Sequence, residues 1–105
     1  MPASEGAAKM EKQRVLELLA QSKQELHERF SVSRLSLFGS MARGVASPKS
    51  DIDILVEFDG PATADRYFGV QFYLEDLFGC DVDLVTDKAL RPEFRPTIER
   101  ERIDV

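Results

Sequence analysis

A glycine–serine pair and an acidic pair lie close together in the sequence and could bind a nucleotide. Ten residues separate Gly39-Ser40 from Asp51, and Asp53 follows two positions later. Glycine lets the backbone approach a phosphate closely, and serine adds a hydroxyl donor. Magnesium is bound in proteins by one or two carboxylates together with phosphate oxygens and water. This spacing therefore indicates binding of a nucleoside triphosphate with its divalent metal ions.

The two acids belong to the clearest predicted strand, which covers residues 51–58. Successive side chains of a strand point to opposite faces, so Asp51 and Asp53 share one face, about 6.6 Å apart along the strand. The apolar side chains of Ile52 and Ile54 alternate with them and require the core. We therefore expect both carboxylates to project outward together.

A second acidic pair, Asp81 and Asp83, accompanies a predicted strand over residues 82–86. If the two acidic strands are neighbours in the sheet, one of these acids completes a cluster of three carboxylates. The alternation of side chains does not choose between the two acids, because both lie on the same face. Asp83 lies deeper in the strand than Asp81.

One helical turn is predicted over residues 41–44, directly after the glycine–serine pair. The free N–H groups at the start of such a turn would face the same anion. Arg43 lies in this turn and could reach a triphosphate as a bidentate donor. Gly39, Ser40 and Arg43 are therefore the candidate nucleotide-binding residues.

Periodicity and breaker residues predict an α+β domain in the α/β class, with a small mixed sheet flanked by helices that pack on one side. Pro96 cannot lie inside a regular helix, so a kink or a late helix start is expected there, with Phe94 and Ile98 facing inward. The predicted elements are helix 10–30, strand 34–38, helical turn 41–44, loop 45–50, strand 51–58, helix 63–78, strand 82–86, a partly helical segment 87–102 and a short terminal strand 103–105.

Length and composition indicate one domain over residues 1–105, with residues 1–9 flexible. No apolar run approaches the ~18 residues of a membrane span, and no secretory signal opens the chain. Cys80 is the single cysteine, so an internal disulfide is excluded and a cytoplasmic protein without membrane contact is expected. The net charge of −5 argues against direct nucleic-acid binding, which depends on neutralising phosphates.

The predicted helix 63–78 carries two apolar stripes, and this pattern indicates burial on both sides. The second stripe, Val70, Tyr73 and Leu77, could face a partner chain or could be covered by the domain's own C-terminal segment. Both alternatives remain open at this point. The first stripe consists of Ala64, Tyr67, Phe68, Leu74 and Phe78.

The run from Gly39 to Val56 resembles the signature of the minimal nucleotidyltransferases of the polymerase-beta superfamily. Ala42-Arg43-Gly44 and the stretch 50–53 are similar to the prokaryotic MNT group in particular. Val82-Asp83-Leu84-Val85 matches the position of the third acid of that family, so the resemblance selects Asp83 over Asp81. The likeness extends from about residue 35 to the C-terminus, and Pro96 is the one unexpected feature.

The resemblance implies a polymerase-beta-like core and transfer of a nucleoside monophosphate from a triphosphate to a hydroxyl. Asp51 and Asp53 would hold two magnesium ions, and Asp83 would share one of them and help to remove the acceptor's proton. Gly39 and Ser40 would hold the β- and γ-phosphates of the substrate.

Chains of this size resemble the antitoxin half of HEPN–MNT toxin–antitoxin pairs. This resemblance implies transfer of AMP from ATP to a tyrosine of a partner HEPN ribonuclease toxin, which is thereby silenced. Two alternatives stay open: a catalytically silent antitoxin that neutralises its toxin by binding alone, and a small-molecule (antibiotic-type) nucleotidyltransferase. The small-molecule alternative requires a homo-oligomer to build the acceptor pocket, since no further domain is expected.

Overall fold

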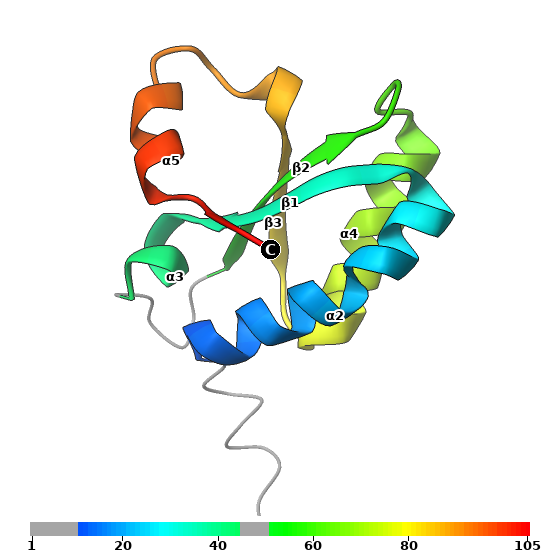
Figure 1. Cartoon of the computed structure of the whole chain (residues 1–105), viewed down its shortest axis with the longest axis horizontal. Helices are drawn as coiled ribbons and strands as arrows, with labels where there is room; N and C mark the ends of the chain where they lie inside the picture. The colour runs from blue at the N-terminus through cyan, green and yellow to red at the C-terminus, as the bar shows by residue number, and fades with distance from the viewer. Residues whose placement is uncertain (1–10, 45–50) are drawn as a thin grey trace, which may run out of the picture.

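The computed structural model describes residues 11–44 and 51–105, and it shows a single sheet with two long helices against one face (Figure 1). The flexible start predicted at 1–9 and the loop predicted at 45–50 lie outside the described residues. The elements are α2 (Lys12–Phe30), β1 (Val32–Phe38), α3 (Gly39–Arg43), β2 (Ile52–Phe58), α4 (Ala64–Phe78), β3 (Val82–Thr86), a 3₁₀ turn η1 (Asp87–Ala89), α5 (Arg95–Glu101) and β4 (Ile103–Asp104).

The sheet is mixed, as predicted, with the strand order β3-β2-β1-β4. β1 runs antiparallel to both β2 and β4, whereas β2 and β3 are parallel and are joined by α4. The parallel register places Asp53 directly opposite Asp83. The two acidic strands are therefore neighbours, which is the arrangement that a carboxylate cluster requires.

Helices α2 and α4 cover the apolar face of the sheet and lie side by side (Figure 1). On α2 the buried side chains recur at helical spacing, at Val15, Leu19, Ser22 and Leu26. On β2 the side chains of Ile52, Ile54 and Val56 face this core, as the alternation predicts. The other buried members of the core come mainly from β1, α3, α4 and β3: Val32, Leu35, Leu37, Met41, Ala42, Val70, Leu74, Phe78, Val82 and Leu84.

Local sequence signals placed both ends of α4 and the start of α5 correctly. The Thr63 hydroxyl caps α4 by accepting a hydrogen bond from the Arg66 N–H at 3.3 Å, and Gly79 ends the helix in the left-handed conformation with φ 70°. Pro96 lies in the first turn of α5, so the helix starts late, at Arg95. Phe94, predicted to face inward, is 53% exposed, because it precedes the helix whose inward residue is Ile98.

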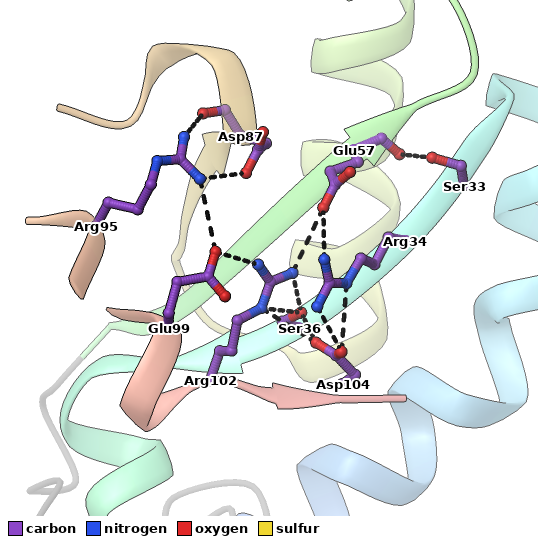
Figure 2. A network of polar contacts seen from close by, with 9 residues as sticks. All are labelled: Ser33, Arg34, Ser36, Glu57, Asp87, Arg95, Glu99, Arg102 and Asp104. Carbon is purple, nitrogen blue, oxygen red and sulfur yellow. Dashed lines mark hydrogen bonds and ion pairs between the residues drawn. The ribbon is translucent and has the colours of Figure 1, made fainter. Parts of the chain in front are cut away.

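The opposite face of the sheet is partly covered by charged side chains from α5 and β4, so the helices do not all pack on one side (Figure 2). The Arg102 side chain is 4% exposed and contacts carboxylate oxygens of Asp104 at 3.1 Å and Glu99 at 3.4 Å. The Arg34 guanidinium contacts Asp104 at 2.7 Å and Glu57 at 3.2 Å. We call Arg34, Glu57, Arg102 and Asp104 the ion network.

The second apolar stripe of α4 is covered by α2. Val70 is fully buried, and Tyr73 and Leu77 pack against the same core, while the Tyr73 hydroxyl donates to Glu25 of α2 at 3.0 Å. The C-terminal segment pairs with β1 through β4, with Ile103 and Val105 packed against the core and the Arg102 and Asp104 side chains on the opposite face. Covering by α2 was not considered from the sequence, because the packing of α2 against α4 is a long-range contact without a local signal. Contact of the half-buried Tyr73 and Leu77 with a partner chain stays a prediction. No helix in the described residues is long and apolar enough to cross a membrane.

Candidate functional site

Gly39 lies at the end of β1 and brings the backbone against the carboxylate of Asp53. Its φ is +75°, and a Cβ built on it would lie 2.1 Å from Asp53 Oδ2, so no side chain fits without movement. Phe38, the preceding residue, is the antiparallel partner of Asp53, which explains the closeness. The close approach to a phosphate that the sequence indicates for Gly39 stays a prediction, and within the fold the Gly39 backbone lies against an acid of the site.

Asp53 and Asp83 form the centre of the candidate site. They are paired across β2 and β3. Asp83 points to the sheet face opposite α2 and α4, which we call the open face, because Val82 and Leu84 on either side are buried in the core. Burial first, and then the charge and hydrogen bond of Asp83 and the charge of Asp51, raise the pKa of Asp53 to about 6. Asp53 therefore holds a proton more readily than an isolated aspartate does.

Asp51 and Asp81 lie at the N-terminal ends of the two strands, directly before β2 and β3. Asp51 is exposed and shares the face of Asp53, and its charge adds to the perturbation of that residue's pKa. Asp81 precedes β3, and its carbonyl accepts a hydrogen bond from the Ile52 N–H at 3.3 Å. Of the second acidic pair, Asp83 is thus the residue opposite Asp53.

The donor set at Asp53 and Asp83 suits a hard divalent cation. No group of three or more His, Cys, Asp and Glu side chains in residues 11–44 and 51–105 is arranged as a ready metal site. Two carboxylates nevertheless match what magnesium takes from proteins when phosphate oxygens and water supply the other ligands. Because like charge and burial disfavour ionisation of Asp53, a cation between these carboxyls would relieve the repulsion. The residues present therefore fit a nucleotide-associated metal ion.

Helix α3 carries the other predicted ligands, Ser40 and Arg43. It begins at Gly39, two residues earlier than predicted, so Ser40 lies in the first turn and is half-buried. The Arg43 guanidinium donates to Glu101 Oε1 of α5 at 3.1 Å, and its positive charge opposes the upward shift of the Asp53 pKa. Arg43 thus lies within electrostatic reach of the acids and is oriented by an ion pair.

Two residues near the site were missed in the sequence, Glu101 and Tyr67. The Tyr67 hydroxyl of α4 donates to the Leu84 carbonyl at 2.6 Å, and burial together with the Asp83 charge raises its pKa. No local signal marks Glu101, which is 58 positions from its partner Arg43. Tyr67 had a weak signal, since it starts a polar series at four-residue spacing along α4 with Gln71 and Glu75.

Comparisons with known proteins agree with this geometry. Residues 19–105 match the family described as nucleotidyltransferase domain. The protein adenylyltransferase MntA of Thermococcus cleftensis is 40% identical over 88 residues, which cover 84% of this chain and 89% of that protein. A solved structure provisionally described as a minimal nucleotidyltransferase is 33% identical, covers 91% of this chain and 97% of its own, and has a TM-score of 0.77.

A more distant likeness extends to a toxin–antitoxin complex. The structure of tri-AMPylated Shewanella oneidensis HEPN toxin in complex with MNT antitoxin covers 89% of this chain and 66% of its own, with 18% identity and a TM-score of 0.56. At that identity the likeness concerns the fold. The family match over most of the sequence, the two relatives above 30% identity and the mixed sheet together show that this chain belongs to the minimal nucleotidyltransferase family.

Proposed function

We propose that the protein transfers AMP from ATP to a hydroxyl of a partner protein, in a reaction that depends on two magnesium ions. The observation that carries this proposal is the pairing of Asp53 with Asp83 beside Gly39, which places two carboxylates face to face with no ion pair to another described residue, where a triphosphate could bind. The family generally uses a nucleoside triphosphate and a divalent metal ion, and a relative of 40% identity is named a protein adenylyltransferase.

In this mechanism Asp51, Asp53 and Asp83 hold the metal ions, which when bound would neutralise charge on the phosphates. Gly39 and Ser40 place the first turn of α3 beside the β- and γ-phosphates, and Arg43 donates to the triphosphate. These residues therefore orient the α-phosphate toward the acceptor.

The acceptor oxygen attacks the α-phosphorus, and the bond from that phosphorus to the oxygen of the β-phosphate breaks. Pyrophosphate leaves with the electron pair of that bond. Asp83 accepts the proton of the acceptor hydroxyl, because its carboxylate is exposed on the open face. In the overall reaction, ATP and a hydroxyl group are converted into the adenylylated hydroxyl and pyrophosphate.

We further infer that the acceptor is a tyrosine of a HEPN-type toxin and that the protein acts as its antitoxin in the cytoplasm. The support is the fold likeness to an MNT antitoxin seen in complex with a tri-AMPylated HEPN toxin. A protein acceptor also agrees with the open face of the sheet beside Asp83, where a partner has access.

The test is to incubate the purified protein with α-labelled ATP, magnesium and the product of the neighbouring gene. Label should move to that product, and to a tyrosine within it, and should be lost with the double variant Asp51→Asn, Asp53→Asn. A double variant that still neutralises the toxin would favour an antitoxin that acts by binding alone. Label found only on a small hydroxyl compound would favour the small-molecule transferase.

A further inference from the structure

Asp83 lies on a strand that the sheet supports on one side only. Among the described strands β3 lies at the edge of the sheet, with β2 as its single neighbour in the order β3-β2-β1-β4. The Asp81 carbonyl points toward β2, where it accepts from Ile52. Backbone groups alternate in direction along a strand, so those of Val82 and Leu84 point away from β2. Without further partners, the residues that flank Asp83 would present free backbone groups at this edge.

Helix α4 supplies partners for these outward groups. The Tyr67 hydroxyl donates to the Leu84 carbonyl at 2.6 Å, and the Gln71 amide donates to the Val82 carbonyl at 3.4 Å. Glu75 Oε2 accepts from the Val82 N–H at 3.3 Å. The three side chains follow one another at four-residue spacing, so they form one row along the helix beside the strand. We call Tyr67, Gln71 and Glu75 the edge row.

The edge row holds the peptide groups on both sides of Asp83. Leu84 is bonded through its carbonyl, and Val82 through both its N–H and its carbonyl. Because these two residues set the direction of the intervening Cα–Cβ bond, they determine whether the Asp83 carboxylate stays opposite Asp53. The Tyr67 hydroxyl is half-buried, and burial and the Asp83 charge raise its pKa, so it remains a donor at neutral pH.

We propose that Tyr67, Gln71 and Glu75 are positioning residues that hold Asp83 against Asp53 by bonding the free edge of β3. The catalytic part of this proposal rests on the proposed adenylyl transfer, whereas its structural part does not. The edge row bonds backbone groups of β3 that point away from β2, so its loss should reduce turnover more than it reduces ATP binding.

The matched pair of variants is Tyr67→Phe and Tyr73→Phe. Both remove one tyrosine hydroxyl from α4, but Tyr73 donates to Glu25 on the helix side, away from β3. Loss of a group that orients a metal ligand costs on the order of tenfold in activity. We expect kcat of adenylyl transfer to fall about tenfold in Tyr67→Phe with KM for ATP within about twofold of the wild type. Tyr73→Phe should keep both constants.

A second pair of variants tests the other end of the row and includes a conservative rescue. Glu75→Gln keeps a carbonyl oxygen that can accept from the Val82 N–H, whereas Glu75→Leu removes the acceptor. Amide hydrogen exchange across β3 should become about tenfold faster in Glu75→Leu and in Tyr67→Phe, because an outward backbone group loses its partner. Exchange should stay at the wild-type rate in Glu75→Gln and Tyr73→Phe.

The two readouts separate the inference from the proposed function. Wild-type protein that transfers no AMP to any acceptor would refute the proposed function, and hydrogen exchange alone would then test the edge row. Equal exchange of β3 in Tyr67→Phe and Tyr73→Phe would overturn the inference. So would an unchanged kcat in Tyr67→Phe, or an equal effect of Glu75→Gln and Glu75→Leu.

Discussion

The open face of the sheet carries two groups of charged residues that differ in how their carboxylates are compensated. In the ion network, burial alone would raise the pKa of Asp104, but hydrogen bonds from Arg34 and Ser36 and the Arg102 charge hold that pKa below its ordinary value. In the candidate site, burial and two further acids raise the pKa of Asp53 to about 6.

This difference in how the carboxylates are compensated distinguishes a structural cluster from a functional one on the same surface. Arg34 and Arg102 compensate Glu57 and Asp104 within the fold, and Figure 2 shows these side chains directed toward one another across β1, β2 and β4. Asp53 faces another carboxyl, and among the described residues only the Arg43 charge opposes the rise of its pKa, so we expect a bound cation to complete the compensation. Perturbed acids of this kind concentrate at functional sites.

The largest effect on stability is expected in the ion network. Arg102→Met removes a guanidinium whose side chain is 4% exposed and leaves three carboxylates, those of Glu57, Glu99 and Asp104, without that partner. Because Arg102 is buried but these carboxylates are 30–46% exposed and two of them keep Arg34 as a partner, we expect a loss of about 2 kcal/mol of unfolding free energy. Urea denaturation should show this loss, whereas Arg14→Met, in an exposed pair, should cost no more than about 0.5 kcal/mol. Similar losses of unfolding free energy in Arg102→Met and Arg14→Met would show that the ion network has no special structural role.

The closeness of Gly39 to Asp53 gives the next largest effect. Gly39→Ala places a Cβ 2.1 Å from the carboxylate, and a displacement of about 1 Å at a reacting group costs roughly 100-fold in rate. Gly44, at the other end of α3, is the matched control because its φ is +76° and no atom of residues 11–44 and 51–105 is found within 4 Å of its added Cβ. Rates of adenylyl transfer should fall about 100-fold in Gly39→Ala and by only a few-fold in Gly44→Ala. Equal losses would mean that backbone strain, not the acid contact, matters.

Arg43 joins the two kinds of region, because it is paired with Glu101 and yet influences Asp53. Arg43→Gln should raise KM for ATP about tenfold through loss of a charge-assisted hydrogen bond to phosphate. A filter-binding or kinetic assay can measure this change. If KM stays constant, Arg43 serves only the ion pair with Glu101.

The pH dependence of stability should have opposite signs in the two regions. Asp53 has a raised pKa, so the folded state binds more protons than the unfolded state between about pH 4 and 6, and stability falls as pH rises through that window. Asp53→Asn should therefore be more stable than the wild type at pH 7, by about 1 kcal/mol after allowance for solvent screening, and equal to it near pH 4.

Asp104 shows the reverse linkage, since its pKa is lowered in the fold. Its contribution is present above the pKa of the unfolded state and is lost as pH falls through the folded value. Asp104→Asn should therefore be less stable than the wild type at pH 7, and the difference should disappear in acid. Thermal unfolding between acid pH and pH 7 measures the stability of both variants. If both variants were more stable than the wild type at pH 7, or both less stable, the comparison would be contradicted.

What could be predicted from the sequence depended on local patterns. The alternation of Asp51 and Asp53 with isoleucines fixed their face, and the Thr63 cap and Pro96 fixed the starts of two helices. Asp83 was chosen over Asp81 by family resemblance and lies opposite Asp53.

What was missed depended on contacts between distant segments. The Arg43–Glu101 ion pair and the Tyr67–Leu84 hydrogen bond join residues that no periodicity relates. The covering of Val70 by α2 likewise follows from how the two helices pack, and no local pattern reports it.

The central claim is that the paired acids Asp53 and Asp83 form the reaction site. The most direct measurement compares adenylyl transfer by Asp83→Asn and Asp81→Asn, which change the same residue type within the edge strand β3 and directly before it. The account predicts a fall of about 10³-fold for Asp83→Asn, comparable with loss of a group that stabilises transition-state charge, and a nearly unchanged rate for Asp81→Asn. Equal losses, or a larger loss in Asp81→Asn, would contradict it.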